Sequence, residues 1–248
     1  MKAIVLSALL IPSALISSAY ASEPIFLVDD DNGKRYEEKY KVWCHEAGIP
    51  ATYWETQSMG TPSLEQMVKY RTVFWFTGNS GSLSNEEEAR LKEYLDNSDG
   101  RRSLLLTGDG LARSLRHGFN DHQQFLGWYL NAHYIKTEGD PDIGVNEQCD
   151  VFRWAYLPAI FSNYSSDDYH FKLWNMADII KPNDGSHRMV MLSNRNATEG
   201  MKNTLECVAV SNRKHFKTVF VTFDLAHEDS RYINESSFIR TCVEWLQQ

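Results

Sequence analysis

The chain reads IFLVDDDNG over Ile25–Gly33, and this stretch decides the fold. Its first four residues form an uninterrupted apolar run, which is typical of a strand buried on both faces of a sheet. Three carboxylates and a turn follow the run, and the spacing of Tyr36, Tyr40 and Trp43 then predicts a helix over residues 35–47. A buried strand that passes through a polar turn into a helix is typical of the first unit of an α/β domain.

The first 21 residues have the features of a signal peptide. Lys2 supplies a positive start, residues 3–16 are almost entirely apolar, and Ala19-Tyr20-Ala21 has the small-x-small form of a cleavage site. Cleavage there would leave one domain over residues 22–248, exported to a periplasm or secreted. A retained anchor is the less favoured alternative, because the apolar segment is short and contains Pro12. We expect no membrane span after cleavage.

The composition is acidic, with 33 Asp and Glu against 25 Lys and Arg and a formal net charge of -8. Proteins that bind nucleic acids present basic surfaces that displace counterions from phosphates. Arg101-Arg102 and Arg213-Lys214 are short local pairs, which we interpret as solvated turn charges. We therefore expect no nucleic-acid partner.

Strand and helix signals alternate through the first half of the chain. Beyond the first strand, apolar runs predict further strands at residues 51–54, 72–77 and 103–107. Helices are predicted to begin near Ser63, Ser84 and Leu111, and Ser84-Asn85-Glu86-Glu87 has the pattern of a capping box. The alternation predicts a doubly wound, mainly parallel sheet with helices on both faces.

The second half is less regular. Residues 133–187 show no clear period, and we expect loops, short strands and a helical turn near 174–180. Three β-rich runs follow at residues 188–193, 205–211 and 218–223, so we expect an irregular β-rich insertion. An amphipathic helix over residues 231–248 is predicted to close the chain.

Several segments together resemble the class I glutamine-amidotransferase-like, flavodoxin-like domains of exported proteins. They read VDDDNG, RYEEKY, YRTVFWFTGNSGSLSNEEEARLKEYL, SLLLTGDGLA and VFVTFDLAHEDSRYINESSFIRTCVEWL. The resemblance covers about the first 90 residues of the mature chain and its last 35. It implies a parallel sheet of order close to 2-1-3-4-5 with helices on both faces.

The chain has four cysteines, an even number in a protein predicted to enter an oxidising compartment, so two disulfides are expected. No two cysteines have the close spacing of a zinc knuckle, which makes a metal site the weaker interpretation. In the fold that the resemblance implies, the first and last helices lie side by side. The resemblance thus implies the pairs Cys44–Cys242 and Cys149–Cys207.

Ligands of an open parallel sheet bind beyond the carboxyl ends of its strands. Three glycine-containing loops of small polar residues should meet there, at residues 29–33, 77–81 and 107–110. Together with the later FDLAHE segment, they supply the candidate ligand-binding residues, which are Asp29, Asp30, Asp31, Asn79, Ser80, Asp109 and His227.

Catalytic members of the family carry a nucleophilic cysteine on a G-x-C-x-G turn, activated by a later histidine and glutamate. The matching turn here is Gly108-Asp109-Gly110, so an aspartate stands in the place of the nucleophile. His227 and Glu228 correspond only to a shifted remnant of the later partners. The resemblance therefore implies a domain without amide-transfer chemistry.

The acidic residues have two further interpretations. Asp29, Asp30, Asp31 and Asp109 could gather as oxygen ligands for Mg²⁺ or Ca²⁺ in a divalent-metal-dependent hydrolase. Acids that precede a helix also cap its free amides and complement its dipole, which is the interpretation we favour. The DDDNG run also lacks the ligand spacing of a calcium-binding loop.

We therefore expect an exported, non-catalytic domain without a cofactor, which binds a small molecule, a glycan or a protein at the carboxyl edge of its sheet. The hydrolase with a divalent cation is the alternative. The middle of the chain is rich in aromatic residues, most of them expected in packing and any exposed ones able to stack on sugars or peptides. They are Trp128, Tyr129, Tyr134, Trp154, Tyr156, Tyr164, Tyr169 and Trp174.

Overall fold

A computed structural model describes residues 22–79, 81–97, 101–117, 120–139, 141–146, 149–161, 170–172, 176–192, 205–226 and 232–248. The predicted signal peptide lies outside these residues. Within the described ranges, none of the helices has both the length and the apolar character needed to cross a membrane.

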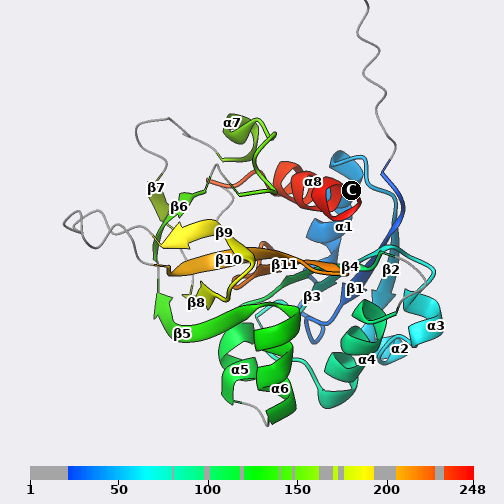
Figure 1. Cartoon of the computed structure of the whole chain (residues 1–248). Helices are drawn as coiled ribbons and strands as arrows, with labels where there is room; N and C mark the ends of the chain where they lie inside the picture. Colours follow the sequence, from blue (N-terminus) through cyan, green and yellow to red (C-terminus); the bar gives the residue numbers. More distant parts are fainter. Residues whose placement is uncertain are drawn as a thin grey trace, which may run out of the picture.

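One sheet of 11 strands lies between two layers of helices, so the α/β class is confirmed (Figure 1). Five of its strands are parallel and adjacent in the order β2-β1-β3-β4-β11. Their bounds are β1 Ile25–Asp29, β2 Ala51–Glu55, β3 Thr72–Phe76, β4 Ser103–Thr107 and β11 Lys217–Val221. Numbered among themselves, these strands have the order 2-1-3-4-5. Their carboxyl ends lie in register, since Asp29 is opposite Phe76 and Phe76 is opposite Thr107.

The other six strands make the expectation of a mainly parallel sheet wrong, because they extend the sheet in antiparallel pairing. They are β5 Ala132–Gly139, β6 Asp142–Val145, β7 His170–Lys172, β8 Met176–Pro182, β9 Ser186–Leu192 and β10 Cys207–Arg213. Strand β10 pairs with β11 and β9, and β8 joins β5 to β10. The β-rich region expected in the second half is thus present, and its described strands extend the sheet with register shifts in the β5–β8 and β9–β10 pairings.

The helical turn expected near residues 174–180 is also wrong where the chain is described, because Met176–Pro182 forms β8. Its short apolar run fits a buried strand as well as a buried helix. Strand alternation sends Ile179 into the core on one face of the sheet and Ile180 into the core on the other.

Helices cover both faces of the sheet, as predicted (Figure 1). One layer contains α1 Glu37–Glu46, α7 Leu157–Ile160 and α8 Glu235–Leu246. The other contains α2 Thr56–Met59, α3 Leu64–Met67, α4 Asn85–Leu95, α5 Leu111–His117, α6 Asn120–Gln124 and a π-helical turn, η1, at Phe125–Tyr129. The first and last long helices are neighbours, since the Arg240 guanidinium of α8 donates to the carbonyls of Ala47 (2.8 Å) and Glu46 (2.9 Å).

The disulfide pairs are wrong, because all four cysteines are free and buried. Cys149 and Cys207 lie in the two cores on opposite faces of the sheet, which keeps them apart. Cys44 and Cys242 share the α1 and α8 core but form no bridge, since adjacency of two helices does not fix the rotation of each about its axis. The pKa of Cys242 is raised first by burial and then by Cys149, so these two thiols are near each other.

Candidate functional site

The three predicted loops meet at the carboxyl edge and interlock through glycine. A Cβ atom at Gly108 would lie 1.9 Å from Thr77 Oγ1, and one at Gly81 would lie 2.5 Å from the Asp109 carbonyl oxygen. Gly78, with φ +58, would place its Cβ 2.8 Å from Cβ of Asp31. Neighbouring protein atoms thus fill the space that these glycines leave. The loops form a packed edge and not a phosphate cradle of the kind that glycine-rich loops often make.

Asp31 organises the loop between β1 and α1. Its two carboxylate oxygens accept hydrogen bonds from the backbone N–H groups of Lys34 (2.8 Å) and Tyr36 (2.9 Å). These bonds flank Arg35, which has φ +63, a left-handed conformation that is uncommon for a residue with a side chain. The predicted capping of this helix by a preceding acid is therefore wrong, because α1 begins after Tyr36 without a side-chain cap and Asp31 bonds amides of the loop ahead of it.

Asp29 lies at the end of β1, with its carboxylate held by neutral donors. Oδ1 accepts from the backbone N–H of Asp31 (3.0 Å), and Oδ2 accepts from the Tyr53 hydroxyl (2.6 Å). Burial raises the pKa of Asp29 to about 6; the hydrogen bond from Tyr53 opposes the rise, while the charges of Asp31 and Glu37 add to it.

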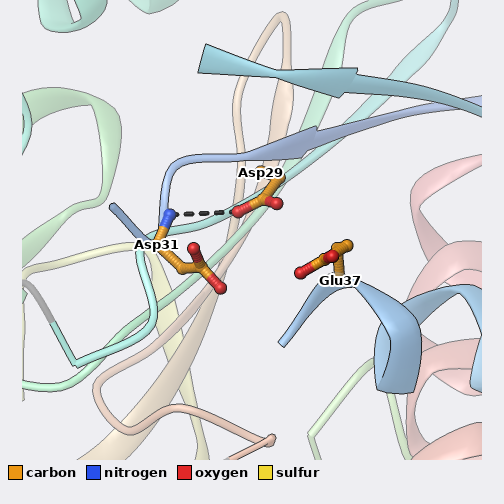
Figure 2. A group of neighbouring side chains, drawn as sticks. All are labelled: Asp29, Asp31 and Glu37. Carbon is orange, nitrogen blue, oxygen red and sulfur yellow. Dashed lines mark hydrogen bonds between the residues drawn. The ribbon is translucent and has the colours of Figure 1, made fainter. Parts of the chain in front are cut away.

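Glu37 completes a group of three acids that the sequence analysis did not assemble. It lies in the first turn of α1, and its side chain points toward Asp29 and Asp31 (Figure 2). One carboxylate oxygen from each residue lies within 4.8 Å of the others. No lysine or arginine forms an ion pair with these carboxylates in the part of the chain that the structure describes. The sequence carries one signal that could have found Glu37, since this residue is an acid at the start of the helix that follows the acidic loop.

Asp30 belongs to a different environment. Its carboxylate accepts from the Thr56 hydroxyl (2.9 Å) and from Nε1 of Trp75 (3.2 Å). Burial raises the pKa of Asp30 to about 7, and the charge of Glu87 and a hydrogen bond with Glu87 raise it further. The consecutive aspartates therefore do not gather into one cluster, because strand-like alternation separates Asp30 from Asp29 and Asp31.

Asp109 is also not part of the group formed by Asp29, Asp31 and Glu37. Its side chain holds the segment that follows β11. Its Oδ1 accepts from the backbone N–H of Asp224 (2.7 Å). Asp224 is fully buried, and its carboxylate accepts from the Tyr40 hydroxyl and the backbone N–H of Ala226 (3.1 Å). Asp224 was missed by the sequence analysis, which considered His227 and Glu228 in this segment.

The side chain of Tyr36 marks where the acids of the three segments converge. Burial raises its pKa, and the charges of Asp224, Asp109 and Asp31 add to the rise in that order. Acids from three segments thus act on one side chain at the carboxyl edge, although each acid has its own hydrogen-bond partners.

Of the remaining candidates, Asn79 is exposed, while Ser80, His227 and Glu228 lie outside the described residues. Among the aromatic residues of the middle segment, Trp154 and Tyr156 have exposed fractions of 90% and 75%. Tyr129 is buried, and Tyr164, Tyr169 and Trp174 lie outside the described residues.

No family model matches the chain, and no curated protein matches its sequence. Among solved structures, the chain is similar to PurLQS from Thermotoga maritima, with 8% sequence identity and a TM-score of 0.44. The alignment covers 89% of this chain and 98% of that chain.

Proposed function

We propose that this protein is an exported, non-catalytic domain of the amidotransferase-like class that binds its ligand at the carboxyl edge of the parallel strands. The ligand is a divalent cation held by Asp29, Asp31 and Glu37. The observation that carries this proposal is the approach of three carboxylates to within 4.8 Å without a basic partner among the described residues.

The charge of this group supports a cation in particular. Asp29 and Asp31 are buried, and among the described residues their carboxylates accept hydrogen bonds from a hydroxyl and from backbone N–H groups, which leave the negative charge in place. Burial of like charges without a counterion is costly, as the raised pKa of Asp29 indicates. Ca²⁺ and Mg²⁺ prefer carboxylate oxygens and complete their shells with water. Glu37 is partly exposed, so the group is open to solvent on that side.

We propose no amide-transfer chemistry, because the nucleophile that this chemistry needs is not in place. The turn at residues 108–110 carries Asp109, whose carboxylate is bonded to the backbone of Asp224. Burial raises the pKa of Cys44 and Cys207 to about 12 and that of Cys149 to about 11. A thiol of this kind is not ionised near neutral pH, and the thiolate is the nucleophilic form.

Isothermal titration calorimetry with CaCl₂ and with MgCl₂ tests the site. We expect binding to the wild-type protein and a loss of about tenfold in affinity in Glu37→Gln, equivalent to about 1.4 kcal/mol. Glu38→Gln is the matched control, because Glu38 is the adjacent acid in the same helical turn and pairs with Lys41 (3.1 Å). Absence of binding by both cations, or an equal loss in the two variants, would contradict the proposal.

A divalent-metal-dependent hydrolase is the second candidate function, and one observation favours it. Burial raises the pKa of Asp30 to about 7, which suits a general acid or base. Asp30 lies between two of the proposed cation ligands in sequence, although its carboxylate faces Thr56 and Trp75. Hydrolysis of p-nitrophenyl phosphate and p-nitrophenyl acetate with added cation is the test. Turnover that Asp30→Asn abolishes while cation binding persists would support the hydrolase.

A further inference from the structure

A basic cavity lies at the opposite edge of the sheet, beside the amino ends of β3, β4 and β11. Its volume is about 270 Å³, and its lining includes six basic side chains, Arg71, Arg101, Arg102, Arg213, Lys214 and Lys217. None of the lining residues that the structure describes is acidic. The sequence analysis interpreted Arg101-Arg102 and Arg213-Lys214 as solvated turn charges. Arg101 and Arg213 are indeed exposed, but the fold brings the two pairs to one cavity.

Lys217 shows that positive charge accumulates here. The side chain is buried at the start of β11, where Nζ donates to the carbonyl of Trp245 (2.6 Å). Burial lowers the pKa of Lys217 to about 8, and the nearby charges of Arg213, Arg71 and Arg101 lower it further. The fold thus holds positive charges close together, and a bound anion would relieve the repulsion between them.

The guanidinium groups are positioned mainly by neutral oxygens. Arg102 donates to the carbonyls of Val68 (2.9 Å) and Tyr70 (3.2 Å). Arg101 donates to a backbone oxygen of Gln248 (3.1 Å), the last residue, whose terminal carboxylate offsets part of the positive charge on this side of the cavity. Carbonyl oxygens orient an arginine without cancelling its charge.

Acidic side chains near the cavity compensate little of the remaining charge. Glu23 Oε1 lies 3.6 Å from Nη1 of Arg71, but the Glu23 side chain is 56% exposed, so solvent screens the pair. The charge of Asp150 is the smallest of the influences on the pKa of Lys217. The Nε atoms of Arg71 and Arg102 are buried and have no hydrogen-bond partner among the described residues.

We propose that this cavity is a binding site for a small organic anion that carries a phosphate group. Arginine presents a planar fork of donors that matches phosphate oxygens, and several forks around one cavity suit a tetrahedral dianion. The volume is near the lower end of the range for small-molecule pockets, which indicates a compact ligand. The site is a pocket on a protein of net charge -8 and not a basic stripe, so it does not suit a nucleic acid.

The experiment is calorimetry on the full-length protein at low ionic strength, with inorganic phosphate and pyrophosphate as probes. We expect both to bind, pyrophosphate more tightly, and each of Arg101→Gln and Arg213→Gln to weaken binding by about tenfold, as loss of a charge-assisted hydrogen bond would. Both side chains are exposed at the rim, so the variants should fold. Arg116→Gln, which removes an exposed arginine of α5 outside the cavity, is the control and should leave affinity unchanged.

Each alternative result overturns the proposal. Citrate that binds where the phosphates do not would assign the cavity to carboxylates. A heparin fragment that binds where the phosphates do not would assign it to a long polyanion. Phosphate binding that is equal in all three variants would place the anion elsewhere on the protein. The result is independent of the carboxyl-edge cation site, since Glu37→Gln should not change phosphate affinity.

Discussion

At the scale of the residue, Asp30 shows how much one position in a run of like acids can differ from its neighbours. It is 8% exposed and touches Thr56, Trp75 and Glu87 on the α4 side of the sheet. Its pKa is raised from 3.8 to about 7, so the folded protein binds this proton more tightly than the unfolded chain does. The stability that protonated Asp30 contributes is therefore present below about pH 4 and is lost as the pH rises through about 7.

Asp30→Asn should remove this pH dependence. An amide cannot ionise, so the variant should gain stability over the wild type by on the order of 1 to 3 kcal/mol between about pH 5 and pH 8. Urea unfolding across that range measures the difference. Asp184→Asn, at an exposed acid, is the control and should follow the wild-type curve. Parallel curves for Asp30→Asn and wild type would show that Asp30 is ionised in both states.

At the scale of the element, α4 begins with a capping box that the sequence predicts correctly. The Glu87 backbone N–H donates to the Ser84 hydroxyl (3.2 Å), and the Ser84 backbone N–H donates to the Glu87 carboxylate (2.6 Å). Glu87 also interacts with Asp30, so the start of this helix is tied to the end of β1. A local motif thus fixes a helix that contributes to the carboxyl edge.

Ser84→Ala should lower the free energy of unfolding by about 1 kcal/mol, because the N–H of Glu87 loses its cap. Thermal or urea unfolding followed by circular dichroism gives the value. Ser82→Ala replaces an exposed serine two residues earlier and should have little effect. A similar loss in both variants would mean that the side chain of Ser84 is not acting as a cap.

The parallel elements could be predicted because each is a local signal. Strands β1, β3 and β4 are buried on both faces and appear in the sequence as apolar runs between polar turns. The antiparallel half could not be predicted in this way, since β8 pairs with β5 across 37 to 50 residues of chain and with β10 through a single register position. Such pairings depend on the whole sheet.

The same distinction between local signals and long-range arrangement applies to the candidate site. The acidic loop and its edge were predictable from the order of strand, turn and helix. The separation of Asp30 from Asp29, the contribution of Glu37 and the convergence of two arginine-containing pairs required the three-dimensional arrangement. The cysteine pairs failed for a related reason. The pair Cys44–Cys242 depended on helix rotations that no local pattern encodes, and the pair Cys149–Cys207 depended on the face of the sheet on which each residue lies.

At the scale of the whole molecule, the two halves of the sheet share both hydrophobic cores. Leu27 of the parallel half and Ile179 of the antiparallel half belong to the core under α1 and α8. Val28 and Ile180 belong in the same way to the core under α4 and α5. Loss of packing in one half should therefore destabilise the other, and the domain should unfold as one unit.

Ile179→Ala tests this coupling. Truncation of a fully buried isoleucine should cost about 2 to 5 kcal/mol and should accelerate hydrogen exchange in β1 and β3 as much as in β8. Ile135→Ala is the control, because Ile135 lies in β5 of the same half and is 44% exposed. Faster exchange confined to the antiparallel strands would show that the halves unfold separately.

The interlocked glycines of the carboxyl edge have a kinetic consequence. Gly78, Gly81 and Gly108 pack the three loops directly against one another, so the described residues of these loops have no room to swing over an arriving ligand. We therefore expect the rate of ligand association at this edge to be set by diffusional encounter and by electrostatic attraction to the acids. We expect no contribution from gating by loop closure.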